Sequence, residues 1–314
     1  VAVNRPKAMV EVETTDELRF CTGMGELDRV LGGGGVAGSL VLVGGAAAAE
    51  TVQSSEGTVY TLPANVSRIE EYAFYGDGEL REIRIPEGVT EIGDLCFSGD
   101  NYLVSLTLPD GLAELPYGAL ESCMRLYDFD LPQGLKKISA SALQYNYYLT
   151  HLTLPSSLTE IEQLNFIGLY GLQSLTLAED NAAFKLDETN GLLMTADGTR
   201  LLHCFSDIVP AEEIILPEGV KIVDPFAFHY DYDVKRVVLP EGVETIGAMA
   251  FAMCPNLTEI VIPASVTDIG AMDGLDGRTG IISYKHNVIV TPEGSSAWNW
   301  AVETGATVKS PEEN

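Results

Sequence analysis

Apolar residues recur along most of the chain in a fixed order around regularly spaced prolines. The unit LREIRIPEGVTEIGDLCFSGDNY has isoleucines one and three residues before Pro86, with a charged residue between them. Such alternation has a period of two and is typical of a short β-strand with one buried face. Further apolar residues follow three, six, ten and eleven residues after the proline. Each unit therefore predicts a strand, a turn and a segment that returns to the core.

The prolines lie 23 residues apart in two series. Proline fixes φ and lacks an N–H, so it marks where a strand stops pairing, and the Glu-Gly or Asp-Gly after it supplies a turn. Ala178 replaces a proline at one step, and the 39 residues from there to Pro217 hold one unit of 23 and 16 inserted residues. Nine strand-and-turn units result, at Pro63, Pro86, Pro109, Pro132, Pro155, Ala178, Pro217, Pro240 and Pro263.

One unit cannot fold alone. Burying about seven apolar side chains contributes roughly 1.5–3 kcal/mol each, whereas ordering a unit costs about 1.5 kcal/mol per residue. Stacked units share their buried faces, so we expect an α/β repeat solenoid that is mostly β. Its core column, eleven residues after the proline, is Phe74, Phe97, Leu120, Leu143, Phe166, Phe228 and Phe251.

The pattern LxxLxLPxxLxxIxxxAFxxCxxL resembles the BspA-like leucine-rich repeats of bacterial surface and secreted proteins, over about residues 57–308. The resemblance implies a right-handed leucine-rich-repeat superhelix with parallel strands on its concave face, and a role in adhesion and protein–protein contact. Short polar side chains at the family's cysteine position are expected to hydrogen-bond the backbone of the next coil, and Leu169 departs from this. That position holds Asp77, Asp100, Cys123, Asn146, Leu169, Asp231 and Cys254.

The sequence predicts two parts: a non-repeat N-terminal segment of low order, residues 1–56, and a leucine-rich-repeat domain, residues 57–314. Within the latter, GLLMT and RLLHCF flank ADGT and predict a hairpin insertion at about 178–212, either a decorative edge or a binding arm. A C-terminal cap with a short helix is expected at about 270–308. There Trp298 and Trp300 serve either cap packing or a ligand platform.

Residues 19–45, RFCTGMGELDRVLGGGGVAGSLVLVGG, resemble RadA/Sms-type DNA-repair ATPases just before their phosphate loop. The next residues, AAAAETVQ, lack the lysine and the following hydroxyl that bind phosphates and magnesium. The same junction resembles the end of a secretory signal with cleavage near Ala49. The segment before it is too long and too acidic for an ordinary signal, so export stays open.

The net charge of −28 argues against nucleic-acid binding, because an acidic surface repels the phosphates of a nucleic-acid backbone. No apolar run is long enough for a membrane span. The five cysteines form no CxxC or Cys/His cluster, and their odd number argues against a disulfide framework. We interpret them as buried free thiols. The four histidines lie in separate segments, and the sequence indicates no catalytic, cofactor or metal site.

The candidate binding residues lie two and four positions before each proline, where the side chains are expected to point to the concave side of the solenoid. The column two before the proline turns apolar after the insertion, at Ile215, Val238 and Val261. These residues contact a partner, are covered by the inserted hairpin, or reflect only the preference of strands for β-branched residues. The full set of candidates is Ile215, Val238, Val261, Arg236, Thr153, Thr176 and His151. A second candidate is the tyrosine-rich loops YNYYL and FHYDY.

The resulting hypothesis is a non-catalytic, monomeric binding module, secreted or at the bacterial cell surface. It mediates adhesin-type contact with a protein partner, of host or matrix origin, or with a glycan. The alternative is a nucleotide-binding, DNA-repair-related protein acting through residues 19–45. No cofactor is expected.

Overall fold

A computed structural model describes residues 50–54, 57–206, 208–271, 280–282 and 286–313. It divides the chain into two compact units, Val1–Leu172 and Gln173–Asn314. The predicted repeat domain is therefore distributed over both units. The RadA-like stretch, residues 19–45, lies outside the described residues.

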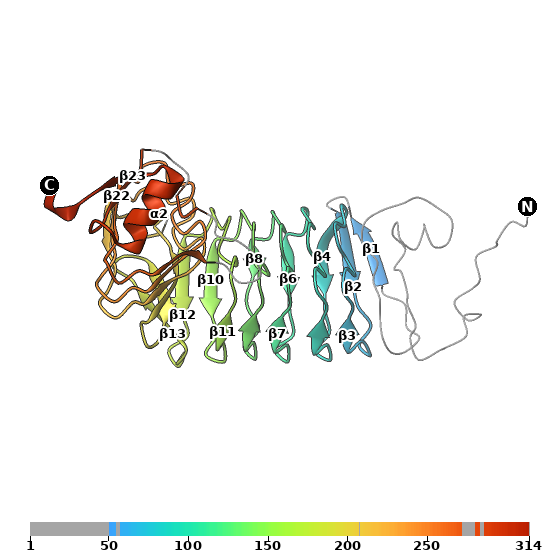
Figure 1. The fold of residues 1–314 in the computed structure, drawn as a ribbon. Helices are drawn as coiled ribbons and strands as arrows, with labels where there is room; N and C mark the ends of the chain where they lie inside the picture. Colours follow the sequence, from blue (N-terminus) through green and yellow to red (C-terminus); the bar gives the residue numbers. More distant parts are fainter. Residues whose placement is uncertain (1–49, 55–56, 207, 272–279, 283–285, 314) are drawn as a thin grey trace, which may run out of the picture. The chain divides into compact units, whose positions relative to one another are not determined.

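The strands that lie just before the prolines form one sheet of each unit, called here the outer sheet, and the shorter strands after the prolines form the inner one. The outer sheet of the first unit has the strand order β1-β2-β4-β6-β8 (Figure 1). β2, β4, β6 and β8 pair in parallel, and each paired position in the regular ladder is 23 residues after the last, as the prolines predict. β1 joins antiparallel at the N-terminal edge, where it pairs with β2. The bounds are β1 Glu50–Ser54, β2 Gly57–Thr61, β4 Leu80–Arg84, β6 Ser105–Thr107, β8 Asp128–Phe129 and, next in the chain, β10 His151–Leu154.

A second parallel ladder, which the sequence pattern does not predict, runs through the same coils. Its strands are two residues long, and each ends on the apolar residue six positions after the proline, which is buried in every case. A two-residue strand has no alternation to detect. These strands are β3 Arg68–Ile69, β5 Glu91–Ile92, β7 Glu114–Leu115, β9 Lys137–Ile138 and β11 Glu160–Ile161, paired as β3-β5 and β11-β9-β7.

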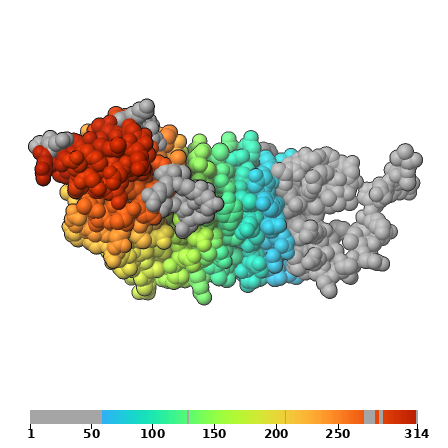
Figure 2. All heavy atoms as spheres, in the orientation of Figure 1, coloured from blue at the N-terminus to red at the C-terminus, as the bar shows by residue number. Residues whose placement is uncertain are grey.

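A tight turn joins the two ladders at each proline. The N–H of Val66 donates to the carbonyl of Pro63 at 3.0 Å, and the N–H of Val89 donates to that of Pro86 at 3.0 Å. Neighbouring coils then approach closely: a Cβ on Gly93 would lie 2.1 Å from the backbone nitrogen of Glu71. Any side chain at Gly93 would push these coils apart. The coils of the first unit pack into a continuous surface (Figure 2).

The predicted core column is confirmed, because all of its seven residues are buried. Phe74 stacks on Phe97 with ring centroids 5.2 Å apart, and Phe228 stacks on Phe251 at 5.1 Å. Between the strands and this column the apolar side chains fill a continuous core in each unit. Stacking of like residues in successive coils therefore holds the array together.

The short polar side chains at the family's cysteine position form buried hydrogen bonds between coils, but to the backbone of the preceding coil and not of the next one. The thiol of Cys123 donates to the carbonyl of Phe97 at 3.0 Å, and that of Cys254 to the carbonyl of Phe228 at 2.8 Å. The amide of Asn146 donates to the carbonyl of Leu120 at 3.0 Å. Each of these carbonyls also accepts an N–H from its own turn, so the side chain adds a second hydrogen bond that links two coils.

The second unit repeats this plan with an outer sheet of order β16-β18-β20-β22-β23, all parallel. Its inner sheet has the order β13-β14-β15-β17-β19-β21. The outer strands are β16 Glu213–Ile215, β18 Arg236–Val238, β20 Glu259–Val261, β22 Val288–Val290 and β23 Thr307–Lys309; β12 is Ser174–Leu177. The inner strands are β13 Phe184–Asp187, β14 Leu192–Thr195, β15 Arg200–Cys204, β17 Ile222–Val223, β19 Thr245–Gly247 and β21 Asp268–Ala271.

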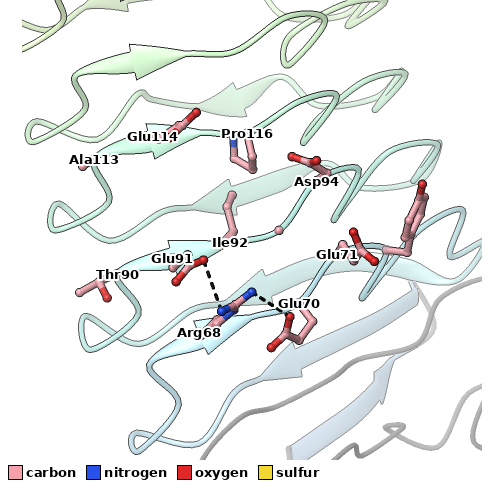
Figure 3. A pocket seen from close by; sticks show the side chains of 12 residues that line it. Arg68, Glu70, Glu71, Thr90, Glu91, Ile92, Asp94, Ala113, Glu114 and Pro116 are labelled. Carbon is pink, nitrogen blue, oxygen red and sulfur yellow. Dashed lines mark ion pairs between the residues drawn. The ribbon is translucent and has the colours of Figure 1, made fainter.

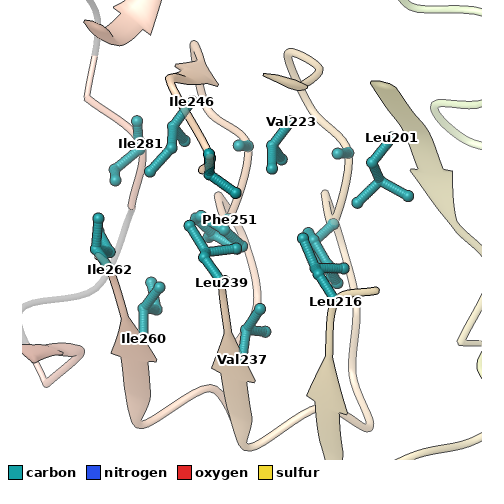
Figure 4. Packing of buried hydrophobic residues seen from close by; sticks show 14 of the residues in the cluster. Leu201, Leu216, Val223, Val237, Leu239, Ile246, Phe251, Ile260, Ile262 and Ile281 are labelled. Carbon is teal, nitrogen blue, oxygen red and sulfur yellow. The ribbon is translucent and has the colours of Figure 1, made fainter. Parts of the chain in front are cut away.

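The insertion contains the predicted hairpin and does more than decorate an edge. β14 and β15 pair antiparallel, and β15 then pairs in parallel with β17, taking a place in the inner ladder. Leu192 and Met194 of β14 belong to the buried cluster of the second unit. Leu201 of β15 belongs to the same cluster, together with Val223 and Phe251 (Figure 4). The insertion therefore supplies part of the core of the second unit.

The C-terminal part of the second unit contains helix α2, Ser296–Thr304. The side chain of Ser295 accepts from the N–H of Trp298 at 3.1 Å, and Gly305 ends the helix with φ of 75°. Ala297 and Ala301 are buried in the core, and Trp300 packs against it. This helix lies where the cap is expected, and Trp300 serves packing.

Candidate binding surface

The apolar residues Ile215, Val238 and Val261 lie side by side on the outer sheet of the second unit. Ile215 pairs in register with Val238, and Val238 with Val261, across β16, β18 and β20. Ile215 is 60% exposed, whereas Val238 and Val261 are half-buried. We call these three residues the outer stripe. Their alternation with Ile214, Val237 and Ile260, which are fully buried, sets which face they occupy.

The inserted hairpin does not cover the outer stripe, so that hypothesis is wrong for Ile215. β15 pairs with β17 of the inner ladder, whereas Ile215 lies on the outer sheet. A covering hairpin would reduce the exposure of Ile215, which is instead among the most exposed large apolar residues described. The stripe therefore presents an apolar surface to solvent.

Charged residues frame the stripe two positions earlier on the same strands. Arg236 lies in register between Glu213 and Glu259, and its guanidinium forms ion pairs with both, with Nε 2.7 Å from Glu259 Oε1. Lys309 Nζ lies 3.0 Å from the other oxygen of Glu259. Hydrogen bonds to Glu259 and Glu213 raise the pKa of Arg236, and the bond from Arg236 lowers the pKa of Glu259. The guanidinium of Arg236 is therefore paired with both neighbouring glutamates and is not an isolated charge on this surface.

The remaining candidates do not join this cluster. His151 and Thr153 lie on β10 in the first unit, and Thr176 lies on β12 in the second. The imidazole Nε2 of His151 is 3.9 Å from Asp130 Oδ1, and its Nδ1 is 3.2 Å from Thr150 Oγ1. All three are exposed, as expected for side chains two and four positions before the turn.

The tyrosine-rich loops divide between core and surface. Phe228 is fully buried and serves the core. Tyr147 stacks on Tyr170 with ring centroids 5.5 Å apart, and Tyr230 stacks on Tyr232 at 6.3 Å. The first stack joins neighbouring coils and the second lies within one loop, while Tyr148 and Tyr232 are exposed.

The repeat pattern matches that of the BspA type leucine rich repeat region, in six copies, over residues 55–186 and 202–272. The chain belongs to this family. The interruption between residues 186 and 202 falls on the hairpin of β14 and β15. Repeats of this family typically serve as non-enzymatic binding modules, and leucine-rich-repeat proteins commonly bind proteins.

Two solved structures share the parallel-strand β-solenoid fold with this BspA-type chain. The pneumococcal vaccine antigen PcpA has a TM-score of 0.62 and 24% identity over 74% of this chain and 62% of its own. A leucine-rich repeat protein from Eubacterium ventriosum has a TM-score of 0.61 and 19% identity over 78% of this chain and 70% of its own. At these identities the likeness shows the fold alone.

A curated relative matches a different part of the chain. The DNA repair protein RadA of Bacillus subtilis is 54% identical over 43 residues, which are 14% of this chain and 9% of that protein. The resemblance of the N-terminal stretch is therefore confirmed, but the chain spans less than a tenth of RadA.

Titratable groups inside the BspA-type repeats are tuned by burial. Cys96, Cys123, Cys204 and Cys254 are buried free thiols, as predicted, and Cys21 lies outside the described residues. Burial raises the pKa of the Cys96 and Cys123 thiols well above the ordinary value, which suppresses the reactive thiolate.

Among the described residues, no three His, Cys, Asp or Glu side chains could together hold a metal ion. No helix in the described ranges is long and apolar enough to cross a membrane.

An acidic groove of about 830 Å³, which is not among the sites expected from the sequence, crosses the inner ladder of the first unit (Figure 3). Arg68 lies 3.1 Å from Glu70 and 3.5 Å from Glu91, while the lining carboxylates of Glu71 and Asp94 are exposed. Aligning the residues five and eight positions after each proline would have revealed this charge. Solvent screens such carboxylates, so the groove attracts cations weakly and selects no particular one.

Proposed function

We propose that the chain is a protein-binding module of adhesin type, secreted or displayed at the cell surface, and that the outer stripe is its contact surface. The observation that carries the proposal is the 60% exposure of Ile215 beside Val238 and Val261 on one regular sheet. Apolar side chains held on a rigid scaffold lose little conformational freedom on binding, so their burial contributes directly to affinity.

The charges around the stripe support the same function. Arg236 is paired with Glu213 and Glu259, so a partner that covers the stripe need not strip water from an isolated charge. An apolar centre within a rim of paired polar groups is the usual composition of a protein interface. The surface location is supported by the family and by the description of the pneumococcal neighbour as a vaccine antigen.

Capture from host mucosal and matrix extracts tests the proposal, with the full chain as bait and captured proteins identified by mass spectrometry. Ile215→Glu should reduce capture of the specific partner at least about tenfold, because a carboxylate would be buried against apolar surface. Val302→Glu is the matched control, since Val302 is also 60% exposed and lies on α2. Equal capture by Ile215→Glu and the parent chain would contradict the proposal. Capture that survives protease treatment of the extract would identify a glycan instead.

Nucleotide binding is the competing function, favoured by the match to RadA. We expect no measurable ATP affinity for the full chain, because AAAAETVQ offers no lysine to the β- and γ-phosphates. Calorimetric titration with ATP and magnesium checks this. A dissociation constant in the micromolar range would show that the N-terminal stretch has kept a function of its own.

A further inference from the structure

Two arginines of the first unit converge on one tyrosine ring. The guanidinium carbon of Arg81 lies 4.5 Å from the ring centroid of Tyr102, and that of Arg125 lies 5.1 Å from it. Arg81 also donates from Nη1 to the carbonyl oxygen of Tyr102 at 3.4 Å. The ring attracts both cations through its π-electrons and holds two like charges in one place.

These arginines differ from the other arginines described in the first unit, because no described carboxylate pairs with them. Arg68 and Arg84 form ion pairs with neighbouring glutamates. Arg81 and Arg125 form none with any residue that the structure describes, and Nε of Arg81 is buried with no acceptor there. In a chain with 46 acidic and 18 basic residues, two adjacent unpaired guanidiniums are not explained by the repeat fold.

Exposed tyrosines extend the same surface along the repeat. Tyr102, Arg125 and Tyr148 occupy the position sixteen residues after the proline in three successive coils, and Tyr127 lies two residues after Arg125. Tyr102 is 39% exposed, Tyr127 54% and Tyr148 63%. Tyrosine and arginine are the residues most enriched at the energetic centres of protein interfaces. We call Arg81, Tyr102, Arg125, Tyr127 and Tyr148 the tyrosine–arginine patch.

We propose that the tyrosine–arginine patch binds a short acidic segment of a protein partner. A carboxylate can accept paired N–H groups from the planar guanidinium of Arg125, while the flanking rings cover the apolar part of the segment. The segment must be short, because the chain carries a net charge of −28 and repels a long polyanion. The patch lies in the first unit and the outer stripe in the second, so neither proposal depends on the other.

Fluorescence anisotropy of the full chain with a labelled hexaglutamate peptide at physiological ionic strength tests this proposal. Arg125→Gln should weaken binding about tenfold or more, the loss expected for a charge-assisted bidentate contact. Lys136→Gln removes the same charge from an exposed position on another turn of the same unit and should leave binding unchanged. Hexaglutamine should not bind. Ile215→Glu should bind hexaglutamate like the parent chain, which separates this surface from the outer stripe.

Three results would overturn the proposal. The first is no saturable binding of hexaglutamate by the parent chain. The second is equal weakening by Arg125→Gln and Lys136→Gln, which would indicate only general attraction. The third is tighter binding of a heparin hexasaccharide that Arg125→Gln abolishes, which would assign the patch to a sulfated glycan. Thermal unfolding of each variant confirms that Arg125→Gln, an exposed substitution, leaves the fold intact.

Discussion

At the scale of single residues, one repeat position shows how the fold tolerates different side chains at different cost. Asn146 is fully satisfied as a donor, giving hydrogen bonds to the carbonyls of Leu120 and Leu143. Asp100 occupies the equivalent position two coils earlier and is completely buried. Its Oδ1 accepts from the N–H of Asp77 at 2.6 Å, whereas its Oδ2 has no partner within the described residues. Burial raises the pKa of Asp100 well above the ordinary value.

Replacing Asp100 by asparagine should therefore stabilise the first unit at neutral pH. The new amide can donate to the carbonyl of Phe74, the counterpart of Leu120, and we expect a gain of about 1 kcal/mol. The folded-state pKa of Asp100 is higher than its unfolded value of about 3.9. The protonated side chain therefore contributes to folding stability below that unfolded value, and this stability is lost as the pH rises through the folded-state pKa. Urea unfolding at pH 4 and pH 7 should show that Asp100→Asn removes this loss, while exposed Asp94→Asn does not. Equal stability of Asp100→Asn and the parent at pH 7 would contradict this account.

At the scale of elements, spacing predicted the outer ladder but not the inner one. The prolines and the alternation around Ile83 and Ile85 determine the outer strands, because each side chain there has a defined face. The inner strands carry one apolar residue each, such as Ile92, so no pattern distinguishes them from a turn. The hairpin was predictable from its central Asp-Gly, but the sheet that β15 would join depends on contacts distant in sequence.

The role of the insertion in the core gives a prediction for one strand. Leu201 of β15 is fully buried and pairs with Val223 of the inner ladder. Leu201→Ala should cost about 2–5 kcal/mol in the free energy of unfolding, as for other buried leucines. Lys185→Ala, at an exposed position on β13, should cost less than about 0.5 kcal/mol. Chemical unfolding measures both, and a small effect of Leu201→Ala would mean that the insertion is only decorative.

The candidate sites were predictable to different degrees for a physical reason. The outer stripe follows from strand register, which the 23-residue spacing specifies, so Ile215, Val238 and Val261 could be aligned from the sequence. The exposure of Ile215 could not, because it depends on where the insertion packs. The tyrosine–arginine patch lies on turns, where the spacing aligns Tyr102 with Arg125 but does not indicate that the guanidinium contacts the ring.

At the scale of the whole molecule, the two units should differ in their response to acid. Burial raises the pKa of Asp231 in the second unit as it does for the buried aspartates of the first, but the second unit also contains buried histidines. Burial lowers the pKa of His203 to about 3 and that of His229 to about 4, so both are neutral when folded. Because the folded-state pKa values of both histidines lie below the unfolded value of about 6.5, the stability they contribute to the folded state is present above pH 6.5. It is lost as the pH falls toward 4. In the first unit burial raises the pKa of Asp77 and Asp100, which favours the folded state at low pH.

Hydrogen exchange between pH 7 and pH 4.5 should therefore show the second unit losing protection while the first keeps it. His229→Phe should reduce the acid sensitivity of the second unit, because the Nδ1 of His229 has no partner among the described atoms and its ring contacts Phe226 and Tyr230. His151→Gln, an exposed change in the first unit, is the control. Loss of protection in the first unit before the second would contradict the assignment.

The central claim is that a partner protein rests on the outer stripe, and site-specific photo-crosslinking tests it most directly. A benzophenone side chain replaces Ile215 in one sample and Val302 in another, two positions of equal 60% exposure in the second unit. Each full-length protein is mixed with the partner identified by capture and irradiated. The account predicts a covalent adduct from position 215 and none from position 302. An adduct from position 302 alone, or equal adducts from both, would place the binding surface elsewhere.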